Sequence, residues 1–159
     1  MGISQNQIVR TLKEFKGVEH RLEHVRTINE VEYINDSKAT NINSVIVAIN
    51  TFDQPIVLIL GGYNKGANFR LLLPHIKSSH VRDIVSYGDA GGQINTALGD
   101  AVRSVQVTDL SSAVKKAQLM AAPGDIVLLS PGCASYDEFS NFEERGNHFK
   151  SIIKSLAAS

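Results

Sequence analysis

The chain has 159 residues, of which 43% are hydrophobic and 20% are charged, as is ordinary for one globular domain. Sixteen basic residues balance sixteen acidic ones, which argues against non-specific nucleic-acid binding and against a polybasic membrane anchor. The single cysteine excludes an internal disulfide, and the apolar runs are far shorter than the roughly 20 residues of a membrane helix. Because the first residues also lack an apolar signal core, we expect a cytoplasmic protein that binds neither nucleic acid nor membranes.

Hydrophobic spacing predicts strands that alternate with helices along the whole chain. The expected elements, in chain order, are a helix over 4–15, strands over 22–28 and 31–34, a helix over 42–49, a strand over 56–60, a helix over 69–76, a strand over 81–87, a helix over 93–98, a strand over 102–107, a helix after Asp109, a strand over 126–129, and a last helix that bears Phe149 and Leu156. This alternation favours an α/β fold with a mostly parallel sheet of about six strands and helices on both faces. The hairpin over 22–34 adds one antiparallel edge strand.

Three polar loops follow predicted strands, at 35–41, 61–66 and 130–137. The carboxyl ends of parallel strands meet at one rim of a sheet, where ligands bind in open α/β folds. We therefore expect these loops to converge on one site.

Each loop also has a simpler structural interpretation. The segment 61–66 could be a tight turn with a solvated Lys65, since the chain has no Gly-x-x-x-x-Gly-Lys-Ser/Thr phosphate loop. Ser135 could cap a helix, with the phenylalanines after it in the core. Arg21 could bind a phosphate or form a surface pair with a glutamate. Neither Cys133 nor Ser135 has the setting of a nucleophile, and the histidines have no metal-ligand spacing, so no metal site is expected.

Four motifs in order give the chain its resemblance to a known family. They lie within 15–23, 35–41, 61–66 and 129–149, and the second reads Asn-Asp-Ser-Lys-Ala-Thr-Asn. Together they resemble the Mur ligase family, in the branch that adds D-glutamate to UDP-N-acetylmuramoyl-L-alanine during peptidoglycan precursor synthesis. Family enzymes have three domains, and this chain resembles the Rossmann-like third domain over 18–159. The helix within 1–17 would be a linker or the end of the central domain.

The resemblance implies a role for several residues. D-glutamate would be held by Thr40, Lys65, Ser135 and Phe142. The nucleotide or its transferring phosphate would face Arg21, Asp36 and Lys38, of which Arg21 and Lys38 would act in catalysis. Tyr136 stands where the resemblance predicts an aliphatic residue, and Tyr63-Asn64 also departs from the usual pair.

The resemblance further implies that ATP and Mg²⁺ are bound mainly by a central domain that this sequence lacks. The chain alone would then be inactive, would hold no tightly bound cofactor, and would act as a monomer whose partners are D-glutamate, ATP, the UDP-sugar acceptor and the other domains. Two alternatives remain open: a non-catalytic α/β module of receiver type, and the corresponding domain of a Mur-type ligase for another amino acid.

Overall fold

The computed structural model of the protein describes residues 17–157, so the helix expected over 4–15 lies outside the described residues. One six-stranded sheet forms the centre of the molecule, with the strand order β1-β2-β6-β3-β4-β5. The strands are β1 Glu23–Ile28, β2 Val31–Asn35, β3 Ile56–Gly61, β4 Val81–Tyr87, β5 Arg103–Gln106 and β6 Ile126–Gly132. Only the pair β1 and β2 is antiparallel among these strands, and the other four pairs are parallel. The predicted fold class is therefore confirmed.

The antiparallel edge begins with a two-residue turn. Asn29 and Glu30 have φ values of 51° and 62°. Two successive positive φ values are the mark of a type I′ turn, whose twist matches that of the flanking strands. The hairpin predicted over 22–34 is thus confirmed.

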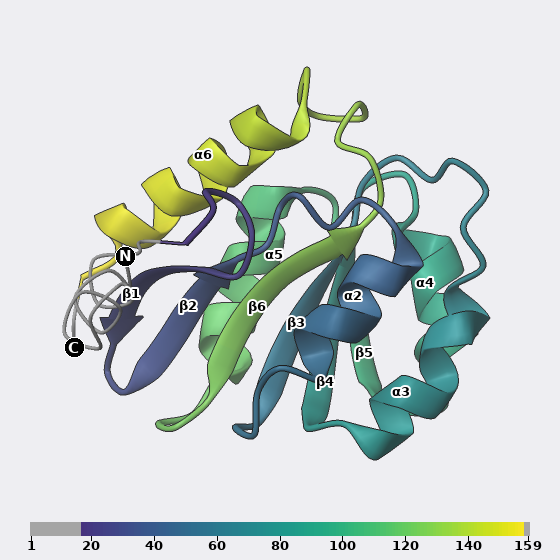
Figure 1. Cartoon of the computed structure of the whole chain (residues 1–159), viewed down its shortest axis with the longest axis horizontal. Coiled ribbons are helices and arrows are strands. Elements are labelled where there is room, and N and C mark those ends of the chain that lie inside the picture. The colour runs from purple at the N-terminus through teal and green to yellow at the C-terminus, as the bar shows by residue number, and fades with distance from the viewer. Residues whose placement is uncertain (1–16, 158–159) are drawn as a thin grey trace, which may run out of the picture.

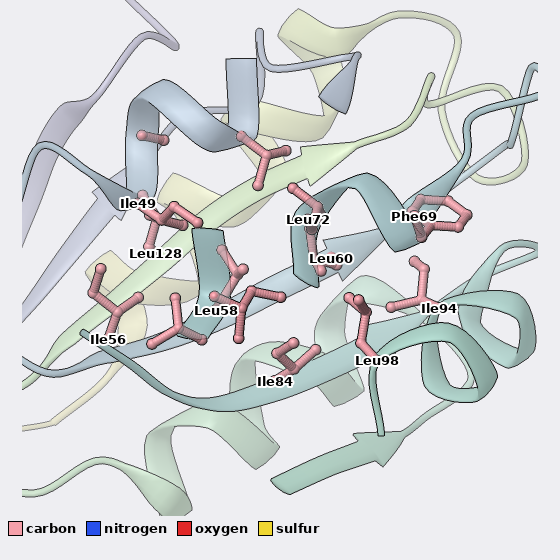
Figure 2. Close-up of a cluster of buried hydrophobic side chains, with 14 of the residues drawn as sticks. Ile49, Ile56, Leu58, Leu60, Phe69, Leu72, Ile84, Ile94, Leu98 and Leu128 are labelled. Carbon is pink, nitrogen blue, oxygen red and sulfur yellow. The ribbon is translucent and has the colours of Figure 1, made fainter. Parts of the chain in front are cut away.

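The helices cover both faces of the sheet (Figure 1). They are α2 Ile42–Ile49, the 3₁₀ segment η1 Phe69–Leu72, α3 Leu73–Ser78, α4 Gly91–Leu98, α5 Leu110–Met120 and α6 Phe142–Ser155. One apolar cluster joins α2, η1, α3 and α4 to the sheet, and Figure 2 shows many of its side chains. A second cluster joins α5 and α6 to the opposite face.

The strand β3 shows why both faces are covered. Its side chains alternate, so that Leu58 and Leu60 enter the first cluster and Val57 and Ile59 enter the second. All four are fully buried. A continuous apolar run is what such a two-sided environment requires.

Three expectations about element ends were wrong. The helix expected over 69–76 begins as the 3₁₀ segment η1, and its α-helical part starts at Leu73. The strand expected to stop at Leu129 continues to Gly132, so residues 130–132 belong to β6 and not to a loop. Ser135 does not cap a helix, because the side chain of Asn141 accepts the hydrogen bond from the Glu144 N–H at the start of α6.

Candidate functional site

The strand β6 lies between β2 and β3, and this position creates a rim where neighbouring connections diverge. The loops after β2 and β3 lead to α2 and η1 on one face of the sheet, whereas the loop after β6 leads to α6 on the other face (Figure 1). In open α/β sheets a ligand crevice opens at such a switch point, outside the carboxyl ends of the strands. The three polar loops thus meet where the topology leaves room for a ligand.

Arg145, in the first turn of α6, ties two of these loops together. Its guanidinium is fully buried and donates to the Ser37 hydroxyl at 2.9 Å, the Ser37 carbonyl at 2.8 Å and the Cys133 carbonyl at 2.9 Å. The Ser37 hydroxyl in turn donates to the Phe142 carbonyl at 2.7 Å. A buried guanidinium needs such a set of acceptors, and here they lie on the loops after β2 and β6.

The structural role of Arg145 was not foreseen from the sequence. A signal was present, because Arg145 and Phe149 are four residues apart and therefore share one helix face. Phe149 is one of the apolar residues of the predicted last helix, and the helix face that carries it is the one that faces the core, which places Arg145 on the buried side of α6.

A second link joins the loops after β3 and β6. The Tyr63 N–H donates to the Ala134 carbonyl at 2.8 Å, and the Ala134 N–H donates back to the Tyr63 carbonyl at 3.1 Å. This pair of hydrogen bonds holds the two loops together. It thereby brings Lys65, which follows Tyr63, close to Ser135, which follows Ala134.

The four residues expected to hold D-glutamate line one hollow of about 310 Å³. They are Thr40, Lys65, Ser135 and Phe142. They come from three loops and from the first residue of α6. The hydroxyls of Thr40 and Ser135 form no hydrogen bond with any residue of 17–157, so both can serve a ligand. One ammonium, two hydroxyls and an aromatic ring are groups suited to a small, anionic, partly apolar molecule.

The three residues expected to face the nucleotide do not line one common hollow. Arg21 and Asp36 line a separate hollow of about 250 Å³ beside α2. Lys38 is exposed and points elsewhere, with its Nζ 5.9 Å from the centre of the Phe142 ring. Lys38 therefore lies nearer to the first hollow. Arg21 makes no ion pair with another residue of 17–157, so the surface pair considered above is absent there; Glu23 pairs with Lys150.

Asp36 is buried, and internal hydrogen bonds use both of its carboxyl oxygens. One oxygen accepts from the Leu22 N–H at 3.2 Å and the other from the Ser130 hydroxyl at 2.8 Å. Burial is the largest influence and raises the pKa of Asp36 to about 6, although these hydrogen bonds and the charge of Arg21 lower it. Asp36 thus anchors the segment before β1 to β6.

Asn35 and His20 complete the support of the loop after β2. The Asn35 amide contacts the His20 Nδ1 at 3.0 Å and donates to Glu23 at 2.9 Å, while its oxygen accepts from the Ser37 N–H. The buried His20 ring packs edge-on against Phe142, with 6.1 Å between ring centres. His20 thereby supports one wall of the hollow that Thr40 lines.

Cys133 lies near the site but is not set up for covalent chemistry. Burial raises the pKa of its thiol to about 12, so the sulfur stays protonated at neutral pH. Among residues 17–157 no group of three or more His, Cys, Asp or Glu side chains is arranged to hold a metal ion. None of the described helices is long and apolar enough to cross a membrane.

A mostly parallel sheet with a polar crevice at its switch point defines an α/β ligand-binding domain of Rossmann-like type. The chain belongs to the Mur ligase family: the family model for "Mur ligase, glutamate ligase domain" matches residues 20–133. The family resemblance found in the sequence is thus confirmed.

Similar proteins narrow the relationship within the family. The chain is 48% identical over 157 residues to the UDP-N-acetylmuramoylalanine–D-glutamate ligase of Natranaerobius thermophilus. The alignment covers 97% of this chain and 34% of that relative. The chain is also 43% identical over 154 residues to the enzyme of the same name from Salinibacter ruber, covering 96% of this chain and 33% of the relative. The chain thus spans about a third of the length of these relatives.

A solved structure supports the fold. The bifunctional folylpolyglutamate synthase/dihydrofolate synthase of Yersinia pestis, complexed with AMPPNP and a manganese ion, superposes with a TM-score of 0.65. The match covers 96% of this chain and 35% of that one, at 18% sequence identity. At that identity the likeness concerns the fold alone.

Proposed function

We propose that this chain is the amino-acid-binding domain of an ATP-dependent ligase that joins D-glutamate to UDP-N-acetylmuramoyl-L-alanine. The observation that carries the proposal is the convergence of Thr40, Lys65, Ser135 and Phe142 on one hollow. Relatives that carry the name of this ligase, at 43% and 48% identity, support the choice of substrate. In this proposal residues 18–159 form the third domain of a monomeric cytoplasmic enzyme, and 1–17 lead into it from the central domain.

The proposed chemistry explains why a ligand site built from cations and hydroxyls suffices. The acceptor carboxylate takes the γ-phosphoryl group of ATP, and the amine of D-glutamate then displaces phosphate from the acyl phosphate. Phosphoryl transfer depends mainly on positioning and on neutralising charge. Lys65 would hold a carboxylate of D-glutamate by a charge-assisted hydrogen bond, and the hydroxyls of Thr40 and Ser135 would donate to carboxylate oxygens.

The nucleotide would be bound jointly by this chain and by another domain of the enzyme. The sequence contains no phosphate loop, so ATP and Mg²⁺ would be bound mainly by the central domain. The Yersinia pestis protein, which was solved with AMPPNP and manganese, supports an ATP-dependent reaction on this type of fold. This chain would contribute Arg21 and Lys38 as cations beside the transferring phosphate. Asp36, whose oxygens already accept internal hydrogen bonds, would line the nucleotide side of the site.

Amino-acid profiling of the complete enzyme encoded by the same gene tests the proposal. The enzyme would receive ATP, Mg²⁺ and UDP-N-acetylmuramoyl-L-alanine together with D-glutamate, L-glutamate, D-aspartate, L-alanine or a diamino acid. We expect the rates of ADP release and of amide formation to be far higher with D-glutamate than with any of the other amino acids. A preference for another amino acid would assign the chain to a different ligase. No ligation with any of them would favour a binding module.

A further inference from the structure

Tyr136 lies at the mouth of the hollow that Lys65 lines, and the residue is 60% exposed. The Lys65 ammonium lies over its ring, 4.8 Å from the ring centre. An ammonium at this distance from an aromatic face is attracted by the negative potential of the ring. The exposed Tyr136 ring therefore has a defined partner, the Lys65 ammonium.

The hollow offers Lys65 another partner, which it does not use. Glu143 lines the same hollow, yet Lys65 forms no ion pair with any residue of 17–157. An ion pair with Glu143 would neutralise the ammonium, and an incoming carboxylate would have to break that pair. The Tyr136 ring attracts the ammonium without neutralising it, and an ammonium has three N–H donors, so donors remain for a ligand.

The ring itself is held in place by its neighbours. The Tyr63 ring lies 6.5 Å from the Tyr136 ring, tilted by 58°, within the range of favourable aromatic pairs. The two backbone hydrogen bonds between Tyr63 and Ala134 fix the main chain two residues before Tyr136. Tyr136 and Lys65 thus sit on two loops that are joined to each other.

We infer that Tyr136 is a positioning residue for Lys65, which keeps the ammonium at the mouth of the hollow with N–H donors available for a substrate carboxylate. The inference rests on the proposed function and deepens it, because it names the residue that orders the main carboxylate-binding group. Because the ammonium has three N–H donors, the ring contact can persist when a carboxylate accepts a hydrogen bond from Lys65. Lys65 then loses less side-chain freedom on binding than a free lysine would.

Steady-state kinetics of the complete ligase test the functional part. We expect Tyr136→Leu to raise the KM for D-glutamate about two- to fivefold with little change in kcat, because the contact acts equally in the bound and transition states. Tyr136→Phe keeps the ring face and should restore a KM close to that of the unmodified enzyme. An unchanged KM in Tyr136→Leu, or a Tyr136→Phe variant as impaired as Tyr136→Leu, would overturn the inference.

A spectroscopic measurement on the 159-residue chain tests the contact itself. In ¹H–¹³C NMR spectra, the Lys65 εCH₂ signal, assigned through Lys65→Arg, should lie upfield of the other lysines because of the Tyr136 ring current. The shift should disappear in Tyr136→Leu and persist in Glu143→Gln. A Lys65 signal at the ordinary position, or a shift that is lost in Glu143→Gln, would contradict the contact. If instead the unmodified ligase did not use D-glutamate while this shift was present, the proposed function would fail and the contact would stand.

Discussion

In the proposed site, Lys65 is the residue whose removal should affect D-glutamate binding most directly. In the complete ligase, Lys65→Ala should raise the KM for D-glutamate and lower kcat/KM by about 2–3 kcal/mol of transition-state binding, as expected for a lost charge-assisted hydrogen bond. Lys77→Ala, which removes an exposed lysine of α3 away from the hollow, is the matched control and should leave kcat/KM unchanged. Equal values of kcat/KM for Lys65→Ala and the unmodified enzyme would remove Lys65 from the site.

Asp36 makes the stability of the chain depend on pH. Its pKa is raised by burial from 3.8 to about 6, so the folded state binds the proton more tightly than the unfolded state does. The resulting stabilisation is complete below about pH 4 and is lost as the pH rises through about 6. We therefore expect the free energy of unfolding of the unmodified chain, relative to Asp36→Asn, to fall by about 2–3 kcal/mol between about pH 4 and about pH 7.5.

Urea titrations at several pH values measure this difference. Comparison with Asp36→Asn removes the contribution of other groups that titrate in the same range. A difference that stayed constant across the range would show that Asp36 has an ordinary pKa in the folded chain.

Arg145 is expected to carry much of the stability of the rim. Arg145→Met keeps an apolar side chain of similar length but leaves the carbonyls of Ser37 and Cys133 without their donor. We expect a loss of about 3 kcal/mol or more in the free energy of unfolding. Arg70→Met, at an exposed arginine of η1, is the matched control and should change stability by less than about 0.5 kcal/mol. Similar losses for the two variants in urea denaturation would contradict this role for Arg145.

At the scale of elements, Gly62 allows the loops after β3 and β6 to approach each other. Its φ is 120°, and a Cβ at this position would lie 2.4 Å from the Ala134 carbonyl oxygen. Gly62→Ala should therefore lower the free energy of unfolding by about 2 kcal/mol or more, because both the backbone strain and the clash must be relieved.

Gly124→Ala separates these two effects. Gly124 also has a positive φ, 93°, but a Cβ there meets no atom within 4 Å. Its replacement should cost only the conformational term of about 1 kcal/mol. If urea denaturation gave the same loss in the free energy of unfolding for both variants, the close approach at Gly62 would make no separate contribution to stability.

The elements that apolar patterns define could be predicted from the sequence, and those that depend on tertiary contacts could not. The run over 56–60 is apolar on both faces, and only a buried strand in a covered sheet suits it. The end of β6 was missed because Pro131 and Gly132 usually interrupt strands. The 3₁₀ segment η1 was missed because its apolar spacing looks the same as that of an α-helix.

The position of a site residue could be predicted from the sequence where it depends only on which strand the residue follows. Thr40, Lys65 and Ser135 each follow a strand that ends at the same rim, so their convergence follows from topology. The direction of Lys38 does not. The chain turns after Asp36, where the Ala39 N–H donates to the Asp36 carbonyl, and Lys38 is carried toward Phe142. Such a turn, like the burial of Arg145, depends on contacts between segments far apart in the sequence.

At the scale of the whole molecule, we propose that the crevice presents one half of a reaction site. Arg21 and Lys65 each line a hollow on the rim, and the sequence has no Gly-x-x-x-x-Gly-Lys-Ser/Thr phosphate loop beside either one. We therefore propose that the site is completed when another domain brings ATP to this rim. Arg21 would then reach the phosphate and Thr40 the amino acid.

The most direct test compares the 159-residue chain with the complete enzyme encoded by its gene. Each would be incubated with ATP, Mg²⁺, D-glutamate and UDP-N-acetylmuramoyl-L-alanine, and mass spectrometry would measure the amide product. We expect product and stoichiometric ADP from the complete enzyme and no product from the chain alone. Product from the chain alone would contradict a shared site, and the absence of product from the folded complete enzyme would contradict the proposed ligase.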